Sequence, residues 1–271
     1  MKLKIAVVQF KTRKFIPEEN IPFVEEFIKK ASKSKADLIV FPEAFLSRNC
    51  SFKKEFSSSE KIGLNKIKEF AKKYKISIIA GSIIEYLNKK KHNTSYYINN
   101  KGKIKGKYQK EHLWINEKGF IKKGKHTTMI SINHIKIGLI LCWDLIFPEI
   151  FRDLEKKGAE IIICPANWSY QDARAGLKYS KDSEVKLIDS ICIERAFEEE
   201  IILVFCNTAG NTINKKLKNT SVGHSQITEP FKGVIKKLNH NKETMFIHEI
   251  DTSILKDAEK AYKIKKDIFN K

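Results

Sequence analysis

The chain has 271 residues, 42% of them hydrophobic and 31% charged, and a formal net charge of +20. A chain of this length can bury a large core, and only 6 prolines and 12 glycines argue against long linkers or low-complexity tails. No segment approaches the roughly 20 apolar residues of a membrane span. The apolar stretch Ile5–Val8 is also too short for a signal peptide. We therefore expect a cytoplasmic protein that makes no contact with a membrane.

The excess of basic residues has two interpretations. Dense basic charge is typical of proteins that bind nucleic acid, because it neutralises phosphates. However, only five of the 52 basic residues are arginine, the residue best suited to bidentate phosphate recognition. The lysines stand in twos and threes at predicted helix ends and turns, as at Lys122–Lys123. A solvated, lysine-rich surface is therefore the favoured interpretation, and a nucleic-acid partner is not expected.

The hydrophobic pattern alternates between strands and helices along the chain. In the first half it predicts helices at 17–34 and 59–75, and strands at 2–10, 37–41, 76–80, 83–87, 93–98 and 104–109. In the second half it predicts helices at 148–157, at 182–199 and after Thr252, and strands at 128–132, 135–141, 161–164, 201–206, 225–227, 234–238 and 245–250. Uniformly apolar strands such as Ile161–Ile163 belong in sheets covered on both faces. We expect one α/β domain spanning residues 1–271.

The cysteines and the other metal-ligand residue types show no pairing pattern. The five cysteines, at 50, 142, 164, 192 and 206, are separate in sequence, as expected for free thiols in a reducing compartment. There is no His-Glu-x-x-His sequence, no Cys-x-x-Cys pair, no acidic calcium loop and no glycine-rich phosphate loop. We therefore expect neither a metal nor a cofactor.

Each of three predicted strands is followed closely by a residue whose side chain can take part in catalysis: Glu43, Lys110 and Cys142. Alone, each has an ordinary explanation as a helix-terminal charge, a solvated cation or a small buried hydrophobe. Together they supply a base, a cation and a thiol at the carboxyl ends of strands, where α/β proteins gather their sites.

The sequence around these residues resembles the nitrilase superfamily of carbon–nitrogen hydrolases. The matching motifs are Phe41–Phe45 around the glutamate, Tyr108–Leu113 around the lysine and Leu141–Glu149 around the cysteine. The resemblance runs from Ile5 to Asp251. It implies a four-layer αββα sandwich of two stacked mixed β-sheets with helices on the outer faces. It also implies a homodimer or a larger homo-oligomer.

The resemblance further implies a role for each residue of the trio. Cys142 is the expected nucleophile and Glu43 the base that takes its proton. Lys110 and the backbone N–H of Trp143 are expected to stabilise the oxyanion of the tetrahedral intermediate. Many family members resemble each other in a second glutamate near the lysine, and Glu117 fits that position best. Asp144 and Glu149 are interpreted as residues that cap or orient the following helix.

The substrate is less closely defined by the sequence. Amides, N-carbamoyl groups and nitriles can all be hydrolysed by such a site, and the motifs look most like the amidase and carbamoyl-amide branches. Branches that act on carboxylate-bearing amides are similar in having an arginine where this chain has Ile146, which weakens that substrate class here. The residues expected near the substrate are Phe45, Trp143, Asn167 and Trp168.

Two other classes of protein remain as alternatives. One is a cysteine hydrolase that pairs Cys142 with a histidine, either His112 or His224. The other is a basic nucleic-acid-binding protein with an enzyme-like fold and an idle site. The presence of all three chemical groups argues against the second alternative.

Overall fold

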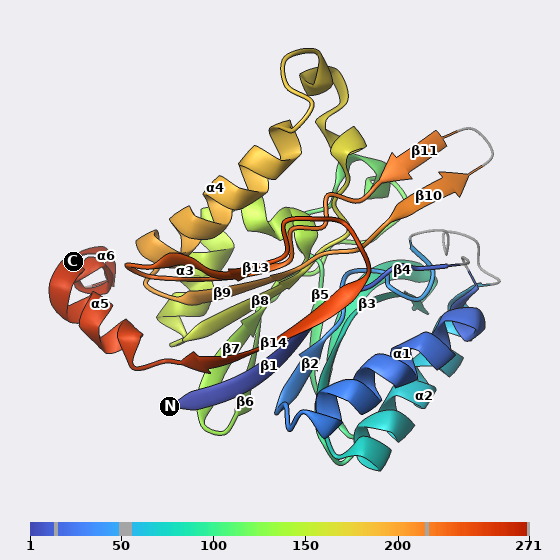
Figure 1. The fold of residues 1–271 in the computed structure, drawn as a ribbon, viewed down its shortest axis with the longest axis horizontal. Helices are drawn as coiled ribbons and strands as arrows, with labels where there is room; N and C mark the ends of the chain where they lie inside the picture. Colours follow the sequence, from blue (N-terminus) through green and yellow to red (C-terminus); the bar gives the residue numbers. More distant parts are fainter. Residues whose placement is uncertain (14–15, 49–55, 215–216, 270–271) are drawn as a thin grey trace.

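The structure is a computed structural model that describes residues 1–13, 16–48, 56–214 and 217–269. Two six-stranded sheets lie face to face, with helices on both outer sides (Figure 1). In spatial order, the first sheet consists of β14 (Thr244–Asp251), β1 (Lys2–Gln9), β2 (Leu38–Val40), β3 (Ser77–Leu87), β4 (Lys90–Ile98) and β5 (Ile104–Gln109). The second consists of β13 (Gly233–Lys237), β12 (Gln226–Glu229), β9 (Ile202–Cys206), β8 (Ile161–Pro165), β7 (Ile135–Leu139) and β6 (Thr128–Ile132).

Both sheets are mixed and share the same plan. Strands β1, β2 and β3 run parallel in the first sheet, and β7, β8 and β9 run parallel in the second. Antiparallel strands flank each parallel set, with β14 on β1 and β4 on β3 in the first sheet. Strand β5 is antiparallel to β4 and therefore points the same way as β3. The carboxyl ends of β2, β3 and β5 thus meet at one edge of the first sheet.

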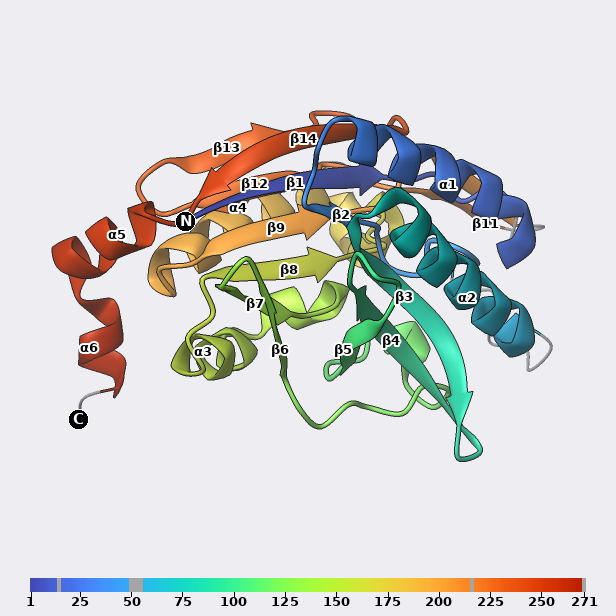
Figure 2. The same cartoon turned by 90° about the horizontal axis from the view of Figure 1, so that it is seen from below.

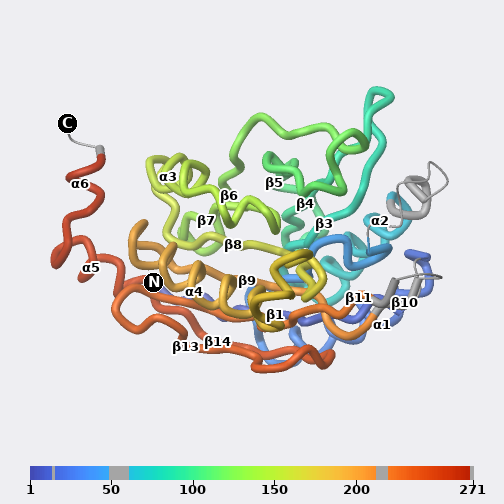
Figure 3. Tube along the Cα trace, turned by 90° about the horizontal axis from the view of Figure 1, so that it is seen from above, coloured from blue at the N-terminus to red at the C-terminus, as the bar shows by residue number. Residues whose placement is uncertain are grey.

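Helices cover the two outer faces. The pair α1 (Pro17–Lys33) and α2 (Phe56–Tyr74) packs on the first sheet, and α3 (Pro148–Lys156) and α4 (Ser183–Glu198) pack on the second (Figure 2). This arrangement confirms the predicted αββα sandwich. The tail is helical, as predicted, and forms α5 (Ile254–Tyr262) and α6 (Ile264–Phe269). These two helices lie at the end of the sandwich opposite the β10–β11 hairpin (Figure 3).

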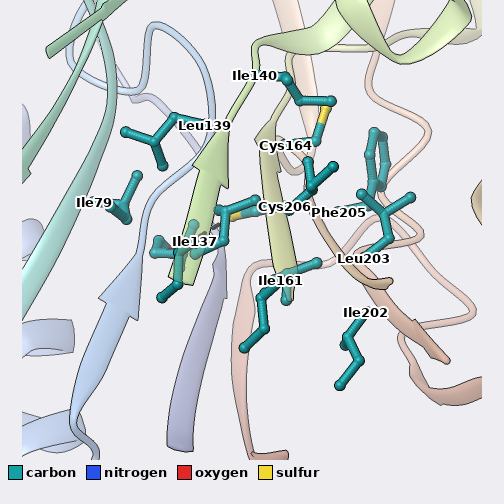
Figure 4. Packing of buried hydrophobic residues seen from close by; sticks show 14 of the residues in the cluster. Ile79, Ile137, Leu139, Ile140, Ile161, Cys164, Ile202, Leu203, Phe205 and Cys206 are labelled. Atoms are coloured by element: carbon teal, nitrogen blue, oxygen red, sulfur yellow. Dashed lines mark hydrogen bonds between the residues drawn. The ribbon is translucent and has the colours of Figure 1, made fainter. Parts of the chain in front are cut away.

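The uniformly apolar strands supply two cores at once. In β2, Leu38 and Val40 belong to the core between the sheets, while Ile39 faces the core beneath α1 and α2. Figure 4 shows Ile79 of the first sheet facing Leu139 of the second across the inner core. Because side chains alternate across a strand, such a strand needs apolar residues at every position. This explains why β2, β8 and β9, which are buried along their whole length, lack a polar face.

The structure differs from the sequence prediction at three kinds of element. Strand β3 continues through Gly81, although the sequence predicted two strands separated there, and its pairing with β4 is irregular between Ala80 and Ile83. The hairpin β10 (Asn211–Asn214) and β11 (Leu217–Thr220) was not predicted. Nor were the 3₁₀ helices η2 (Ile115–Glu117), η3 (Cys142–Ile146) and η4 (Tyr170–Lys178).

The close approach of Pro42 explains why a glycine stands inside β3. A Cβ atom added at Gly81 would lie 1.9 Å from the carbonyl oxygen of Pro42. The Pro42 backbone immediately precedes Glu43, so the glycine lets the segment that carries Glu43 cross directly over the strand.

We predict that Gly81→Ala destabilises the fold by about 1–3 kcal/mol, because backbone rather than a flexible side chain blocks the new methyl group. Urea unfolding measures this difference. Gly176→Ala is the matched control, because its nearest contact for a new Cβ is an ordinary 3.6 Å. Equal stability of the two variants would contradict the steric explanation.

Candidate active site

The structure brings together the three strand-end residues that the sequence singled out. Glu43 follows β2, Lys110 follows β5, and Cys142 lies just beyond β7 in the facing sheet. All three side chains are almost completely buried, with exposed fractions of 2% for Glu43, 2% for Lys110 and 8% for Cys142. The thiol of Cys142 and the Glu43 carboxylate are near enough for each to shift the pKa of the other. The trio therefore spans the two sheets at one edge of the sandwich.

Lys110 lies between two buried carboxylates. Its Nζ atom is 2.8 Å from Glu43 Oε1 and 2.8 Å from Glu117 Oε2. Glu117, at the end of η2, is 3% exposed, and its Oε2 atom also accepts the backbone N–H of Trp114 at 2.8 Å. The structure thus places Glu117 beside Lys110, where the sequence expected it, and fixes the orientation of its carboxylate.

Asn93 completes this buried network. Its Nδ2 atom donates to Glu43 Oε1 and to Glu117 Oε1, each at 2.8 Å, and its own side chain is 1% exposed. The backbone N–H of Lys110 donates to the carbonyl of Asn93 at 2.9 Å. Asn93 was not among the site residues predicted from the sequence. The one signal in the sequence was that this polar residue begins the predicted strand 93–98, whose neighbour, the predicted strand 104–109, is followed by Lys110.

Burial and charge determine the protonation states in this cluster. Burial raises the pKa of Glu43 above its ordinary value, although the charge of Lys110 opposes the shift. Burial and the neighbouring Glu43 carboxylate raise the pKa of the Cys142 thiol. Burial acts to lower the pKa of Lys110, but Glu43 and Glu117 more than offset this, and the pKa lies above its ordinary value. At neutral pH the lysine is therefore charged and the thiol keeps its proton.

Tight backbone turns present both Glu43 and Cys142. Cys142 has a φ of 49°, in the left-handed region that non-glycine residues rarely adopt. Ala44, immediately after Glu43, has the same φ of 49°, and its N–H donates to Ser82 Oγ at 3.0 Å. The backbone of Asn167 acts to lower the pKa of the Cys142 thiol, against the effect of burial. The thiol is thus held on a strained turn.

Asp144 holds the backbone turn at Cys142 in place through hydrogen bonds. It is fully buried, and its Oδ2 atom accepts the N–H of Leu141 at 2.9 Å and the hydroxyl of Tyr108 at 2.7 Å. Its Oδ1 atom accepts the N–H of His112 at 2.8 Å. Asp144 does not cap α3, because no side chain caps that helix at Phe147. Its bond to the N–H of Leu141 caps η3 instead, and its other bonds tie the cysteine turn to the end of β5. Glu149 does lie in the first turn of α3.

Neither histidine of the alternative mechanism is placed to serve the thiol. The Nδ1 atom of His112 is 2.9 Å from Asp144 Oδ1, and its ring stacks on Phe147 with a centroid separation of 3.8 Å. His224 directs Nδ1 toward Asp189 Oδ1 at 3.4 Å. These contacts favour Glu43 over a histidine as the partner of Cys142.

The residues expected near substrate fall into two groups. Trp143 is half-buried and belongs to an aromatic group in which its ring centroid lies 4.4 Å from Trp114 and 5.6 Å from Trp168. Trp168 is 2% exposed and its Nε1 donates to Glu184, so it supports Trp143 from within the core. The side chain of Asn167 accepts the hydroxyl of Thr208 at 3.0 Å.

Phe45 does not join the aromatic group beside the site. Its fully buried ring stacks on Phe41 at a centroid separation of 5.0 Å and contacts Phe10 edge-on. Phe45 therefore packs in the core beneath α1 and α2, and its substrate-binding role stays a prediction. Phe45 stands two residues after Glu43 in the motif, and its side chain points into the core beneath the helices. The backbone turn at Ala44 determines that direction.

Comparisons with known proteins give the family of this two-sheet sandwich and its buried carboxylate, lysine and thiol. The family model for carbon-nitrogen hydrolases matches residues 4–260. A probable nitrilase of Schizosaccharomyces pombe is 30% identical over 97% of this chain and 93% of its own length. The 2-oxoglutaramate amidase of Bacillus subtilis is 29% identical over 87% of this chain and 86% of its own. The chain belongs to the carbon-nitrogen hydrolase family, the nitrilase superfamily.

Solved structures agree with this assignment. Nit3 of Saccharomyces cerevisiae, a member of branch 10 of the superfamily, matches with a TM-score of 0.80 and 25% identity over 99% of this chain and 97% of its own. The carbon-nitrogen hydrolase of Helicobacter pylori G27 shares the fold with a TM-score of 0.89 at 22% identity, covering 98% of this chain and 95% of its own. The protein is thus an enzyme that hydrolyses carbon–nitrogen bonds other than peptide bonds.

Two features are absent from the described residues: a metal-binding cluster of side chains and a membrane-spanning helix. No group of three or more His, Cys, Asp or Glu side chains in those ranges is arranged to hold a metal ion. Among the same residues, no helix has the length and apolar character needed to cross a bilayer.

We predict that Lys110→Met destabilises the protein by about 3–5 kcal/mol at pH 8, because two buried carboxylates lose the charge between them. Lys110 lowers the pKa of the buried Glu43, so without the lysine that pKa rises further, and stability falls as pH rises through it. The deficit should therefore shrink at pH 5, where the carboxyls bind protons. Urea unfolding at the two pH values measures it.

Lys107→Met is the matched control. This lysine lies on the same strand and pairs with Glu85 at 2.8 Å, but it is 37% exposed, and its loss should cost at most about 1 kcal/mol. A Lys110→Met deficit that does not change with pH would contradict the charge explanation.

Proposed function

We propose that the protein hydrolyses the amide bond of a small primary amide through an acyl-enzyme on Cys142, releasing ammonia. The observation that carries this proposal is the buried contact of Cys142 with Glu43 and of Glu43 with Lys110. A neutral thiol beside a carboxylate needs that carboxylate as its base, and a fixed ammonium group beside both suits a developing oxyanion. The names of the relatives, which include amidases of several kinds, support an amide substrate.

The chemical steps follow from this arrangement. Cys142 Sγ attacks the amide carbonyl carbon while Glu43 takes the thiol proton, and a carbon–sulfur bond forms. Lys110 Nζ and the backbone N–H of Trp143 hold the oxyanion. The carbon–nitrogen bond then breaks as Glu43 gives its proton to the departing nitrogen, which leaves as ammonia. Water, activated by Glu43, attacks the thioester, and the carbon–sulfur bond breaks to return the thiol and a carboxylic acid.

Glu117 and Asn93 act through the other groups. Glu117 shares the Lys110 ammonium with Glu43, and Asn93 donates to both carboxylates. We assign both as positioning residues. They keep Glu43 aimed at the thiol while it gains and loses a proton twice in each turnover. Trp143 and its aromatic neighbours form the wall against which the substrate packs.

The part of the substrate distant from the amide is either neutral or anionic. Arg174 on η4 places its guanidinium carbon 5.9 Å from the centroid of the Trp114 ring, and its Nη2 donates to Asn116 at 3.0 Å. Trp114 in turn contacts Trp143. Arg174 therefore places a positive charge over the aromatic wall, although position 146 is an isoleucine and not an arginine. This observation keeps monoamides of dicarboxylates among the candidates. N-carbamoyl compounds and nitriles are alternative substrates for the same site.

We further propose that residues 1–271 form a single hydrolase domain, and that this domain works as a cytoplasmic homo-oligomer. The single domain is supported by one continuous core that joins residues of both sheets, from Leu3 to Leu255. The oligomer rests on the resemblance to the family.

A substrate panel tests the proposed reaction. We expect ammonia release from at least one member of a panel of aliphatic amides, dicarboxylate monoamides, N-carbamoyl amino acids and nitriles. Cys142→Ser should lose at least about 10³-fold of that rate, because the nucleophile is replaced. Cys192→Ala, which changes a buried thiol on α4, should keep the activity. Equal ammonia release by wild type and Cys142→Ser would refute the thiol mechanism.

The pH dependence tests the role of Glu43. The base must be ionised, and burial raises the pKa of Glu43 above the ordinary 4.5. We therefore predict that kcat/KM falls as pH is lowered, with a midpoint above pH 4.5. The charged state of Lys110 should persist past pH 10, because its two glutamate partners raise its pKa from 10.5. Steady-state kinetics from pH 4 to 10 give the profile. A midpoint below 4.5 would contradict the buried-base assignment.

A further inference from the structure

A pocket of about 380 Å³ lies on the outer side of the β4–β5 hairpin, near the active site but not part of it. Its wall contains His92 of β4, Lys107 and Gln109 of β5, Thr128 of β6, and Lys122, Lys123, Lys125 and His126 of the connection between β5 and β6. Figure 3 shows this connection in green. No acidic residue belongs to the wall.

The pocket faces away from the catalytic groups. On β4, Asn93 directs its side chain at Glu43 and Glu117, whereas the adjacent His92 lines the pocket. On β5, Tyr108 bonds to Asp144 while its neighbours Lys107 and Gln109 line the pocket. Successive residues of a strand point to opposite faces, so the hairpin separates the two sites. A ligand in this pocket would not occupy the substrate position.

Three of its lysines are uncompensated. In the described part of the chain, Lys122, Lys123 and Lys125 take part in no salt bridge and no side-chain hydrogen bond, and all three are exposed. Lys107 differs, because it pairs with Glu85 at 2.8 Å. Three like charges around one concavity repel one another and create a positive potential that an anion relieves.

The backbone that carries these lysines is fixed in place. The N–H of Lys122 donates to the carbonyl of Lys91 and the N–H of Gly124 donates to the carbonyl of Lys110, both at 2.8 Å. A Cβ atom at Gly124 would lie 2.0 Å from the carbonyl oxygen of Gln109, which shows how closely the segment packs on β5. The lysine positions are therefore set before any ligand arrives, which lowers the entropy cost of binding.

His92 supplies a second, independent observation. Its side chain is 8% exposed, and its Nδ1 atom has no hydrogen-bond partner among the described residues. Burial lowers the pKa of this imidazole, and the charges of Lys107 and Lys122 lower it further, although the Glu85 carboxylate acts in the opposite direction. A buried polar atom without a partner is uncommon in a folded protein, and at a pocket wall a ligand or its water can satisfy it.

We propose that this pocket binds a small phosphate-bearing molecule as a ligand distinct from the substrate. Lysine binds phosphate as a point charge, and three uncompensated lysines match the multiple charges of a phosphate ester or pyrophosphate. A volume near 400 Å³ suits a small molecule and is too local for a nucleic-acid backbone, whose binding needs basic charge spread over many phosphates. The proposed site assigns a binding function to three of the lysines that contribute to the net charge of +20.

Isothermal titration of the full chain at low salt tests the proposal, with inorganic phosphate, pyrophosphate and adenosine monophosphate as probes. We expect saturable binding of at least one probe at one site per chain. Citrate, a compact polyanion without phosphorus, should bind at least tenfold more weakly. The double variant Lys122→Gln/Lys125→Gln should weaken binding at least tenfold, and His92→Phe should weaken it measurably with the lysines intact. A thermal melt of each variant checks that it is folded.

The matched control is Lys29→Gln/Lys33→Gln, which removes the same charge from the exposed face of α1. It should leave the affinity unchanged. Equal weakening by both double variants would show a response to net charge alone and overturn the proposal. Citrate bound as tightly as the phosphates, no binding of any probe at millimolar concentration, or binding only of a long RNA oligonucleotide would each overturn it as well. None of these readouts depends on hydrolase activity.

Discussion

The structure depends on one buried interaction, the Lys110 ammonium held between Glu43 and Glu117. Removing three charged groups from water is costly, and the cost is offset only where every charge has a partner with good geometry. Here the geometry comes from four separate segments: β2, β4, β5 and η2. Asn93 donates to both carboxylates, and the Trp114 backbone fixes Glu117. The cluster therefore exists only in the folded sandwich, and the sandwich in turn must bring those segments within hydrogen-bonding distance.

That requirement explains several backbone features away from the cluster. Gly81 lets the Pro42 backbone cross β3, which brings Glu43 over the edge of the sheet. Ala44 and Cys142 adopt left-handed conformations at the two turns that face each other. Asp144 uses both oxygens to fix the cysteine turn against β5. Strain at the turns is compensated by these hydrogen bonds and by the apolar core beneath them.

The sequence predicted the elements better than their contacts. Long apolar periodicities and flanking turns located most strands and helices to within a few residues, because alternation and helical spacing are local properties. The trio was found because strand ends of an α/β sheet converge. Asn93 was missed because its role depends on which strand lies beside it and in what register, and that is not a local property. The direction of the Phe45 side chain is not predictable from the motif for a related reason, because it follows the turn at Ala44. The β10–β11 hairpin has no comparable apolar periodicity to indicate it.

The protonation of Cys142 distinguishes this site from one that stores a reactive thiolate. In a thiolate–imidazolium pair the nucleophile is charged at rest, and its pKa is lowered by the positive partner. Here burial and the Glu43 carboxylate raise the pKa of the thiol, and the nearby Lys110 is already engaged by two carboxylates. In the proposed mechanism the proton therefore leaves sulfur only when a carbonyl carbon is present to accept the new bond, and Glu43 can hold it because burial raises the pKa of that carboxyl too. On this proposal, the same burial that suppresses the resting thiolate prepares the base, and substrate binding rather than a stored charge initiates the reaction.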